Sequence, residues 1–227
     1  MKKMRGISQE GLKALACILM LVDHVGAVLF PHFLSLRIVG RLSFPIFCFL
    51  LTEGAMRTRK PMGYILRLLL AALISEIPFD LAFYGHIGPE GQNVMWTLLL
   101  GCAMLTAMKK VGNPGKCCLL ILFAIAAECL RTDYGGYGIL IIGLFELTRG
   151  VKGAGLIRAV GLTAIGAVIP SAVLTVWGIS VPIQCFCALS LIPIECYNGR
   201  KRGYSPWTQW GFYSFYPVHL LALHFLR

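Results

Sequence analysis

The sequence predicts an all-α, polytopic integral membrane protein, a helical bundle with about nine transmembrane helices. Of its 227 residues 57% are hydrophobic and only 14% are charged, and the mean hydropathy is +0.75. A soluble domain is usually about 45–50% apolar and about 25% charged. These values argue against a water-soluble fold and a disordered chain. The net charge of +11 falls at the ends of apolar runs, which is typical of membrane-protein loops rather than of a nucleic-acid binder.

Apolar runs of membrane-spanning length recur along the whole chain, where about 20 residues are needed to cross the hydrocarbon core. The first run carries Asp23 and His24 and lacks a cleavage site, so it is a span rather than a signal peptide. The fifth and sixth runs are short, so eight or ten spans would also fit. No segment could fold as a separate soluble domain, so residues 1–227 are expected to form one domain. The predicted spans are 9–30, 37–56, 62–84, 93–109, 116–131, 135–149, 154–177, 180–197 and 208–226.

The positions of Lys and Arg orient these spans, because cytoplasmic loops are enriched in both residues. Most of the 21 basic residues fall on alternate loops, which predicts a cytoplasmic N-terminus, an external C-terminus and a location in the cytoplasmic (inner) membrane. Basic loops favour anionic lipid headgroups and could equally hold an anionic cofactor. The loop residues are Lys2, Lys3, Arg5, Lys13, Arg57, Arg59, Lys60, Lys109, Lys110, Lys116, Arg149, Lys152, Arg158, Arg200, Lys201 and Arg202.

Ionisable side chains from distant parts of the sequence lie at similar depths near the outer ends of several spans. A charge at the bilayer centre costs at least about 2.5–3.5 kcal/mol, so each is a candidate functional residue. Facing one another, the carboxylates can pair with Arg41 and Arg131 and can orient a histidine, which predicts an outward-opening polar chamber suited to general acid–base chemistry. Its members are Asp23, His24, Arg41, Glu76, Asp80, Glu128, Arg131, Asp133 and His219.

Other polar residues are less informative. For Glu53, Glu146 and Glu195, near the inner face, a role in tying helices together and a functional role are equally open. The nine cysteines lie mostly within apolar runs, so neither a disulfide framework nor a metal site is expected.

A series of short motifs resembles the TraX family, which is named for the conjugation protein that acetylates the N-terminus of F-pilin. Each motif is weak alone, but their order and spacing are specific, and the resemblance covers nearly the whole chain, most strongly residues 11–101. The motifs are Asp23-His24-Val25-Gly26, the run 40–49 with Glu53-Gly54 and Thr58, Tyr64-x-x-Arg67-Leu68, the run 75–80, Asn93 with the run 97–101, Asp133-Tyr134-Gly135 and Phe215-Tyr216-Pro217-x-His219-Leu220.

This resemblance implies a multi-span acetyltransferase related to the transmembrane acyltransferases. That group includes bacterial sugar O-acetyltransferases and the lysosomal heparan glucosaminide N-acetyltransferase. Such enzymes move acyl groups from cytoplasmic acyl-CoA to acceptors on the far side and use an intramembrane histidine. His24 matches that histidine, with Asp23 beside it. Further motif positions, to which the resemblance assigns no individual role, are Arg41, Glu53, Glu76, Asp80 and Asp133.

The residues and the resemblance together give one site hypothesis. His24 is a general base or a transient acyl carrier, and Arg41 stabilises the oxyanion. The donor is acetyl-CoA, and the acceptor is an amine or hydroxyl of an extracytoplasmic peptide or glycan. The expected catalytic residues are His24, Asp23, Arg41, Glu76 and Asp80; the expected substrate-binding residues are Glu53, Asn93, Arg131, Asp133 and His219; the expected acetyl-CoA contacts are Arg57, Arg59 and Lys60.

Two other functions fit part of the pattern. Intramembrane carboxylates and histidines also form the proton relays of secondary transporters, although the two related halves typical of many transporters are not visible in the sequence. A non-enzymatic membrane scaffold or chaperone subunit is the third reading, and it leaves the concentration of ionisable groups unexplained.

Overall fold

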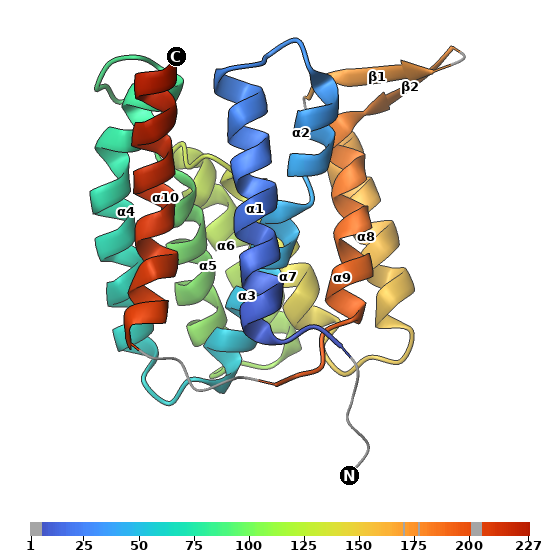
Figure 1. Ribbon diagram of the computed structural model, residues 1–227. Coiled ribbons are helices and arrows are strands. Elements are labelled where there is room, and N and C mark those ends of the chain that lie inside the picture. Colours follow the sequence, from blue (N-terminus) through green and yellow to red (C-terminus); the bar gives the residue numbers. More distant parts are fainter. Residues whose placement is uncertain (1–5, 170, 177, 201–205) are drawn as a thin grey trace. The chain divides into compact units, whose positions relative to one another are not determined.

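The computed structural model describes residues 6–169, 171–176, 178–200 and 206–227, and most of these residues are helical (Figure 1). The basic residues Lys2, Lys3, Arg5, Lys201 and Arg202, predicted for inner loops, lie outside the described residues. The chain divides into two compact units. Unit 1 comprises Met1–Leu50 and Gly150–Phe215, and unit 2 comprises Leu51–Arg149 and Tyr216–Arg227.

Unit 1 is formed by helices from both ends of the sequence. Its first helix begins where the Ser8 hydroxyl oxygen accepts a hydrogen bond from the Gly11 amide at 3.2 Å, a typical N-cap. Helix α1 packs on α2, and α8 packs on η1 and α9. The elements are α1 (Gln9–Val28), α2 (Leu34–Gly40), the first half of α3 (Ser43–Arg57), α8 (Ala154–Val168), β1 (Val173–Val176), β2 (Ile179–Pro182), the 3₁₀ helix η1 (Ile183–Ser190), α9 (Leu191–Glu195) and the first half of α10 (Pro206–Leu226).

The prediction of two long helices over 154–177 and 180–197 is wrong. Helix α8 ends at Val168, and β1 then pairs antiparallel with β2, with Thr175 opposite Ser180 (Figure 1). The strands are rich in β-branched residues, which favour extended backbone, and Gly178 between them has a φ of 79° that glycine adopts without strain. The following segment is mostly 3₁₀ helix, and α9 has only five residues.

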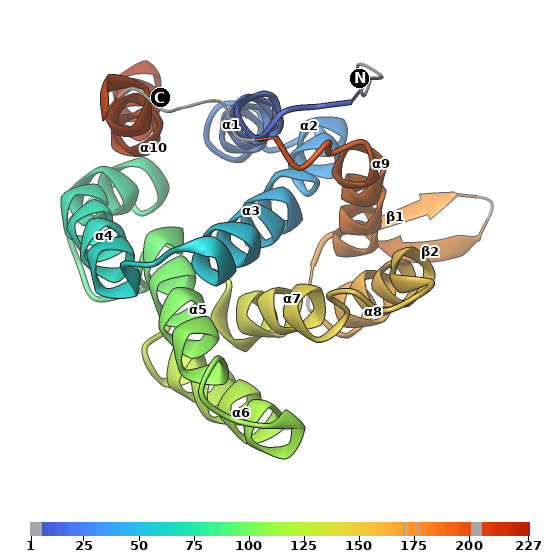
Figure 2. The same ribbon diagram turned by 90° about the horizontal axis from the view of Figure 1, so that it is seen from below.

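Unit 2 matches the sequence-based prediction closely. The observed helices α4 (Pro61–Phe83), α5 (Val94–Met108), α6 (Asn113–Cys129) and α7 (Gly135–Leu147) each lie within a few residues of a predicted span. Helix α5 packs against α4, α6 and α7, as the end-on view shows (Figure 2). The second halves of α3 and α10 complete the unit.

Contacts within unit 2 place alternate loops at opposite ends of its helices. At one end, Lys109 after α5 donates to the Ala55 carbonyl oxygen near the end of α3 at 2.6 Å. At the other end, the loops that precede α5 and α7 are hydrogen-bonded, because the Gln92 amide donates to the Arg131 carbonyl oxygen at 2.9 Å and the Asp133 amide donates to the Gln92 carbonyl oxygen at 2.7 Å. This is the alternation that the Lys and Arg pattern predicts for this part of the chain.

Helix α4 exposes apolar side chains and buries polar ones. Leu66, Leu70, Leu73 and Ile77 form one face at helical spacing, and each is 49–55% exposed, whereas the buried Asp80 is 1% exposed. Exposed apolar faces of this kind mark contact with lipid or another apolar partner.

Two helical stretches of the described residues are long and apolar enough to cross a membrane, namely Gln9–Val28 and Leu34–Arg57. Shorter apolar helices are Val94–Met108, Gly135–Leu147, Ala154–Val168 and Ile183–Glu195.

Candidate functional site

In unit 1, one buried carboxylate holds two arginines. Asp23 of α1 accepts hydrogen bonds from Arg37 Nη1 at 2.8 Å to Oδ2, and from Arg41 Nη2 at 2.7 Å to Oδ1 and 2.5 Å to Oδ2. Arg37 Nη1 also donates to the Asp23 backbone carbonyl oxygen at 3.0 Å, and Arg41 Nη1 donates to Gln184 Oε1 at 3.3 Å. We call Asp23, Arg37 and Arg41 the Asp23 clamp.

The local sequence explains how the Asp23 clamp forms. Arg37 lies in the last turn of α2 and Arg41 is its C-cap, so the two side chains are one helical turn apart on the same side. Gly40 lets the two helices meet backbone to backbone, because a Cβ there would lie 2.2 Å from Asp23 Cβ and 2.6 Å from Asp23 Cα.

The Asp23 clamp changes the chemical role expected for Asp23. Its carboxylate binds Arg41, so it positions the guanidinium that was expected to stabilise an oxyanion. His24, the next residue of α1, points about 100° away around a helix and is partly buried. The structure therefore places Asp23 and Arg41 together in unit 1, and His24 follows Asp23 in the sequence.

In unit 2, the carboxylate of Glu76 on α4 is fixed by two donors from α5. Asn93 Nδ2 and Trp96 Nε1 both donate to Oε2, the latter at 3.0 Å. Asn93 is fully buried, and it also donates to the Ala72 carbonyl oxygen at 2.8 Å and caps α5 by accepting from the Met95 amide at 3.0 Å. The other carboxylate oxygen of Glu76 is buried with no hydrogen-bond partner among the described residues.

Asp80 lies one turn after Glu76 on the same helix face. Its Oδ2 accepts a hydrogen bond from the Gly88 amide at 3.2 Å, while Oδ1 is buried without a partner within the described part of the chain. An unsatisfied buried acceptor costs about 1–3 kcal/mol. Two such oxygens one turn apart suit a bound group that carries N–H or O–H donors.

Three further predicted substrate-binding residues, Arg131, Asp133 and His219, also belong to unit 2. Asp133 and Arg131 are exposed in the loop before α7, and Arg131 has a φ of 50°, in the left-handed region. His219 on α10 is 7% exposed, and its ring centroid lies 5.7 Å from that of Tyr216. Unit 2 thus contributes Glu76, Asp80, Asn93, Arg131, Asp133 and His219.

The expectation of a single chamber joins residues of both units, because His24 and Arg41 belong to unit 1 and Glu76 and Asp80 to unit 2. It stays a prediction.

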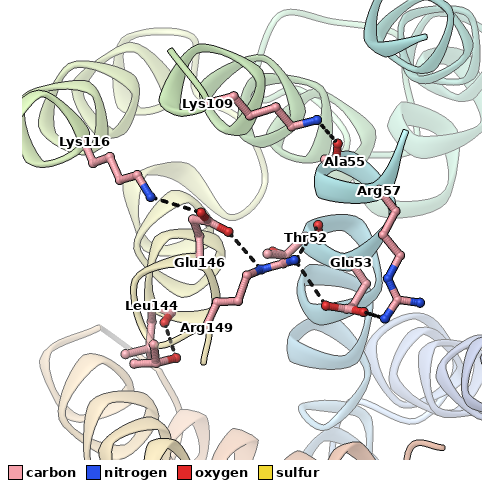
Figure 3. A network of polar contacts seen from close by, with 10 residues as sticks. Thr52, Glu53, Ala55, Arg57, Lys109, Lys116, Leu144, Glu146 and Arg149 are labelled. Atoms are coloured by element: carbon pink, nitrogen blue, oxygen red, sulfur yellow. Dashed lines mark hydrogen bonds and ion pairs between the residues drawn. The ribbon is translucent and has the colours of Figure 1, made fainter. Parts of the chain in front are cut away.

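At the opposite end of unit 2, six charged residues form a network that joins the end of α3, the C-cap of α5, the first turn of α6 and the end of α7 (Figure 3). Arg149 bridges both carboxylates, with Nη2 3.1 Å from Glu53 Oε1 and Nε 3.3 Å from Glu146 Oε2. Arg57 pairs with Glu53, and Lys116 lies 3.2 Å from Glu146. We call this set the cationic network: Glu53, Arg57, Lys109, Lys116, Glu146 and Arg149.

The cationic network brings together two residues that the sequence analysis assigns to different groups. Glu53, predicted to bind the acceptor, contacts Arg57, predicted to bind acetyl-CoA, at the end opposite to Glu76. Arg59 and Lys60 follow Arg57 and are exposed. Among the described residues, no group of three or more His, Cys, Asp or Glu side chains is placed to hold a metal ion.

Sequence reasoning missed several partners that the structure reveals. Arg37 could have been found, because it lies four residues before Arg41. Trp96 and Gln184 carry no signal, since an indole or amide in an apolar run does not reveal its partner. Arg149 was read only as a loop charge.

The fold and contacts define a mostly helical protein that buries paired carboxylates and arginines among apolar helices. Residues 8–227 match the family model described as TraX protein, so the chain belongs to the TraX family, and the resemblance of the sequence motifs is confirmed.

Two known proteins are similar in sequence to this chain. A probable fimbrial assembly protein, FimC of serogroup H1, from Dichelobacter nodosus is 31% identical over 93% of this chain and 92% of its own length. An uncharacterised protein of Rickettsia prowazekii (strain Madrid E) is 49% identical over 41 residues, 18% of this chain and 16% of that protein. No solved structure matches this chain.

The Asp23 clamp predicts that Asp23→Asn, which removes the charge but keeps the shape of the side chain, lowers the stability of the protein. Arg37 and Arg41 would lose their common anion, and losing one partner of a buried ion pair costs about 3–5 kcal/mol. We expect a clearly lower Tm in detergent. Glu195→Gln is the control, because Glu195 is 57% exposed and lies 3.6 Å from Arg158. Equal Tm values for the two variants would contradict a structural role for the Asp23 clamp.

In the loop after α4, the contact between His86 and Glu90 predicts a raised pKa of His86 that can be measured. His86 Nε2 contacts Glu90 Oε1 at 2.7 Å, and this carboxylate raises the pKa of His86 above its ordinary value of 6.5 and has its own pKa lowered. The ion pair of protonated His86 and ionised Glu90 is therefore present between pH 4.5 and pH 6.5, is lost as the pH rises through the raised pKa of His86, and is lost as the pH falls through the lowered pKa of Glu90. NMR titration should show this raised pKa, and Glu90→Gln should return it toward 6.5. A His86 pKa that Glu90→Gln leaves unchanged would exclude the pair.

Proposed function

We propose that this protein is a multi-span membrane acetyltransferase that moves an acetyl group from cytoplasmic acetyl-CoA to an amine or hydroxyl acceptor at the outer face. The observation that carries the proposal is the match to the TraX family over nearly the whole chain. The relative from Dichelobacter nodosus is named as a probable fimbrial assembly protein, which favours a peptide acceptor over a glycan.

A location in the cytoplasmic membrane, with about nine spans and the N-terminus inside, is part of this proposal. It is supported by the exposed apolar face of α4, by the two long apolar stretches near the N-terminus and by the alternating ends of unit 2. With this orientation, the cationic network faces the cytoplasm and Glu76 and Asp80 lie toward the outside.

His24 is assigned the proton transfer. A neutral ring nitrogen of His24 accepts the proton when the acceptor N–H or O–H bond breaks and the new C–N or C–O bond forms. The thioester C–S bond then breaks, and His24 returns the proton to the leaving sulfur; transient acyl transfer to His24 is the alternative route. Arg41, held by Asp23, stabilises the negative charge that develops on the carbonyl oxygen. Glu76 and Asp80 supply acceptor oxygens for the N–H or O–H groups of the acceptor molecule.

Acetyl-CoA supplies an acetyl group activated as a thioester, and the residues present suit its phosphates. Arg57, Arg59 and Lys60 are exposed cations at the end of α3, and Arg and Lys are the usual partners of phosphate. Asn93, Arg131, Asp133 and His219 remain the proposed contacts of the acceptor. The contact of Glu53 with Arg57 favours a role on the donor side instead.

A proton-coupled transporter is the second candidate, favoured by one observation. Glu76 and Asp80 each have a buried oxygen without a partner in the described chain, a feature expected of a proton relay.

The test of the enzyme uses purified protein in lipid nanodiscs with radiolabelled acetyl-CoA and a synthetic peptide that has a free α-amino group. We expect release of CoA and labelling of the peptide, and a loss of about 10²–10⁴-fold in His24→Ala, the usual contribution of a general base. His32→Ala is the matched control, because His32 is exposed in the loop before α2.

Circular dichroism establishes that both histidine variants are folded. Unchanged turnover in His24→Ala would remove His24 from the chemistry. Absence of acetyl-CoA binding, together with proton flux in liposomes that Glu76→Gln abolishes, would identify a transporter.

The proposed orientation predicts opposite labelling of two loops. In a protein without its native cysteines, Ile87→Cys should react with an impermeant maleimide in intact cells, and Gly112→Cys should react only after permeabilisation. Both positions are exposed, so access to the protein surface is equal. The reverse pattern would show that the topology is inverted. Equal labelling would show that the two loops lie on the same side of the membrane.

A further inference from the structure

The cationic network carries more positive charge than its carboxylates neutralise. Within the described residues, three of its four cations, Arg57, Lys116 and Arg149, pair with the two carboxylates of Glu53 and Glu146. The fourth, Lys109, donates to a backbone carbonyl oxygen. The exposed residues Arg59, Lys60 and Lys110 on neighbouring segments add to the excess. Pairing within the protein therefore leaves this end of unit 2 able to bind an anion (Figure 3).

Arg149 is held in place before any ligand arrives. Its Nη2 donates to the Thr52 carbonyl oxygen at 3.3 Å and to Glu53 Oε1 at 3.1 Å, and its Nε faces Glu146 Oε2 at 3.3 Å. A guanidinium has five N–H donors. The two on Nη1 have no partner within the described residues, and the side chain is 35% exposed. A guanidinium already fixed in this way loses little conformational entropy when it binds a further acceptor.

Lys109 is anchored in the same manner. Its ammonium group donates one hydrogen bond, to the Ala55 carbonyl oxygen at 2.6 Å, and has three donors in total. Thr52 and Ala55, the backbone anchors of Arg149 and Lys109, are three residues apart near the end of α3. Both cations are thus held by the same helical turn, which also carries Glu53.

We propose that Arg149 and Lys109 bind a phosphate group, and that Glu53 and Glu146 position the cations instead of contacting the acceptor. The inference rests on the proposed function, in which the phosphate belongs to the nucleotide part of the acyl donor. Arginine suits phosphate because its planar N–H fork matches two oxygens. Lipid headgroups carry the same phosphate chemistry, so the test separates the two sources.

The experiment measures binding without catalysis. Adenosine 3′,5′-bisphosphate is titrated calorimetrically into the full-length protein in zwitterionic nanodiscs. We expect binding that weakens about tenfold in Arg149→Gln, the loss of one charge-assisted contact, and only partly in Arg149→Lys, which keeps the charge but not the fork. Arg149→Gln leaves Arg57 on Glu53 and Lys116 on Glu146, so each carboxylate retains a cation and the fold should persist.

Two further variants separate positioning from general stability. Glu53→Gln should weaken bisphosphate binding several-fold although it adds positive charge, because it releases Arg57 and Arg149. An effect of net charge alone would strengthen binding. Arg158→Gln in unit 1 is the matched control, since Arg158 also pairs with a glutamate, Glu195, and should bind the bisphosphate as the unchanged protein does.

Each outcome decides the inference. Binding that is unchanged in Arg149→Gln but lost in Arg57→Gln overturns the inference and leaves acetyl transfer standing. No binding by the unchanged protein overturns the inference, and the acetyl-transfer assay then judges the proposed function separately. A third outcome is that Arg149→Gln leaves bisphosphate binding unchanged but reduces the number of phosphatidylglycerol molecules retained in native mass spectrometry. This result would support a phosphate site that binds lipid headgroups and would overturn its assignment to the nucleotide.

Discussion

The need to neutralise carboxylates inside apolar helices constrains this protein more than any other interaction. A buried ion is tolerated only where a counter-ion and hydrogen bonds replace water. Asp23 meets this need with Arg37 and Arg41, which fixes α2 against α1. Glu53 and Glu146 meet it through Arg149, which ties α3 to α7. Apolar packing alone could be satisfied by many arrangements of these helices, whereas each ion pair specifies one pair of facing positions.

The length of apolar runs predicted the helices wherever hydropathy was the deciding quantity. Helices α4 to α7 lie within a few residues of their predicted bounds because each run ends at charged, Gly or Pro residues. Prediction failed over 154–197 because hydropathy does not distinguish an apolar helix from an apolar hairpin, and the β-branched residues of β1 and β2 favoured strands. The predicted span 37–56 falls within the apolar stretch Leu34–Arg57, in which α2 and α3 meet at a turn formed by Arg41 and Leu42.

The candidate site was predictable in its residue types and not in its partners. Depth within apolar runs identified Asp23, Glu76 and Asp80, and the cost of burying charge implied that such carboxylates pair with Arg41 or Arg131. The same reasoning could not find Trp96, because its indole N–H is invisible in an apolar run. A loop charge such as Arg149 indicates orientation in a sequence, and only its two carboxylate contacts reveal a fixed guanidinium.

The two ends of unit 2 carry opposite charges: cations gather at one end, and the carboxylates of Glu76 and Asp80 lie toward the other. Helix α4 runs from Lys60, beside the exposed cations at the end of α3, to Glu76 and Asp80. Each of these carboxylates has a buried oxygen that accepts no hydrogen bond from the described residues. From Lys60 to Glu76 and Asp80 the helix rises by about 24 Å and about 30 Å, at 1.5 Å per residue. An anion bound at one end and an N–H or O–H donor bound at the other are held apart by nearly the thickness of a hydrocarbon core. The proposed acetyl transfer across that distance requires the reacting carbonyl to lie among the helices, between these two ends.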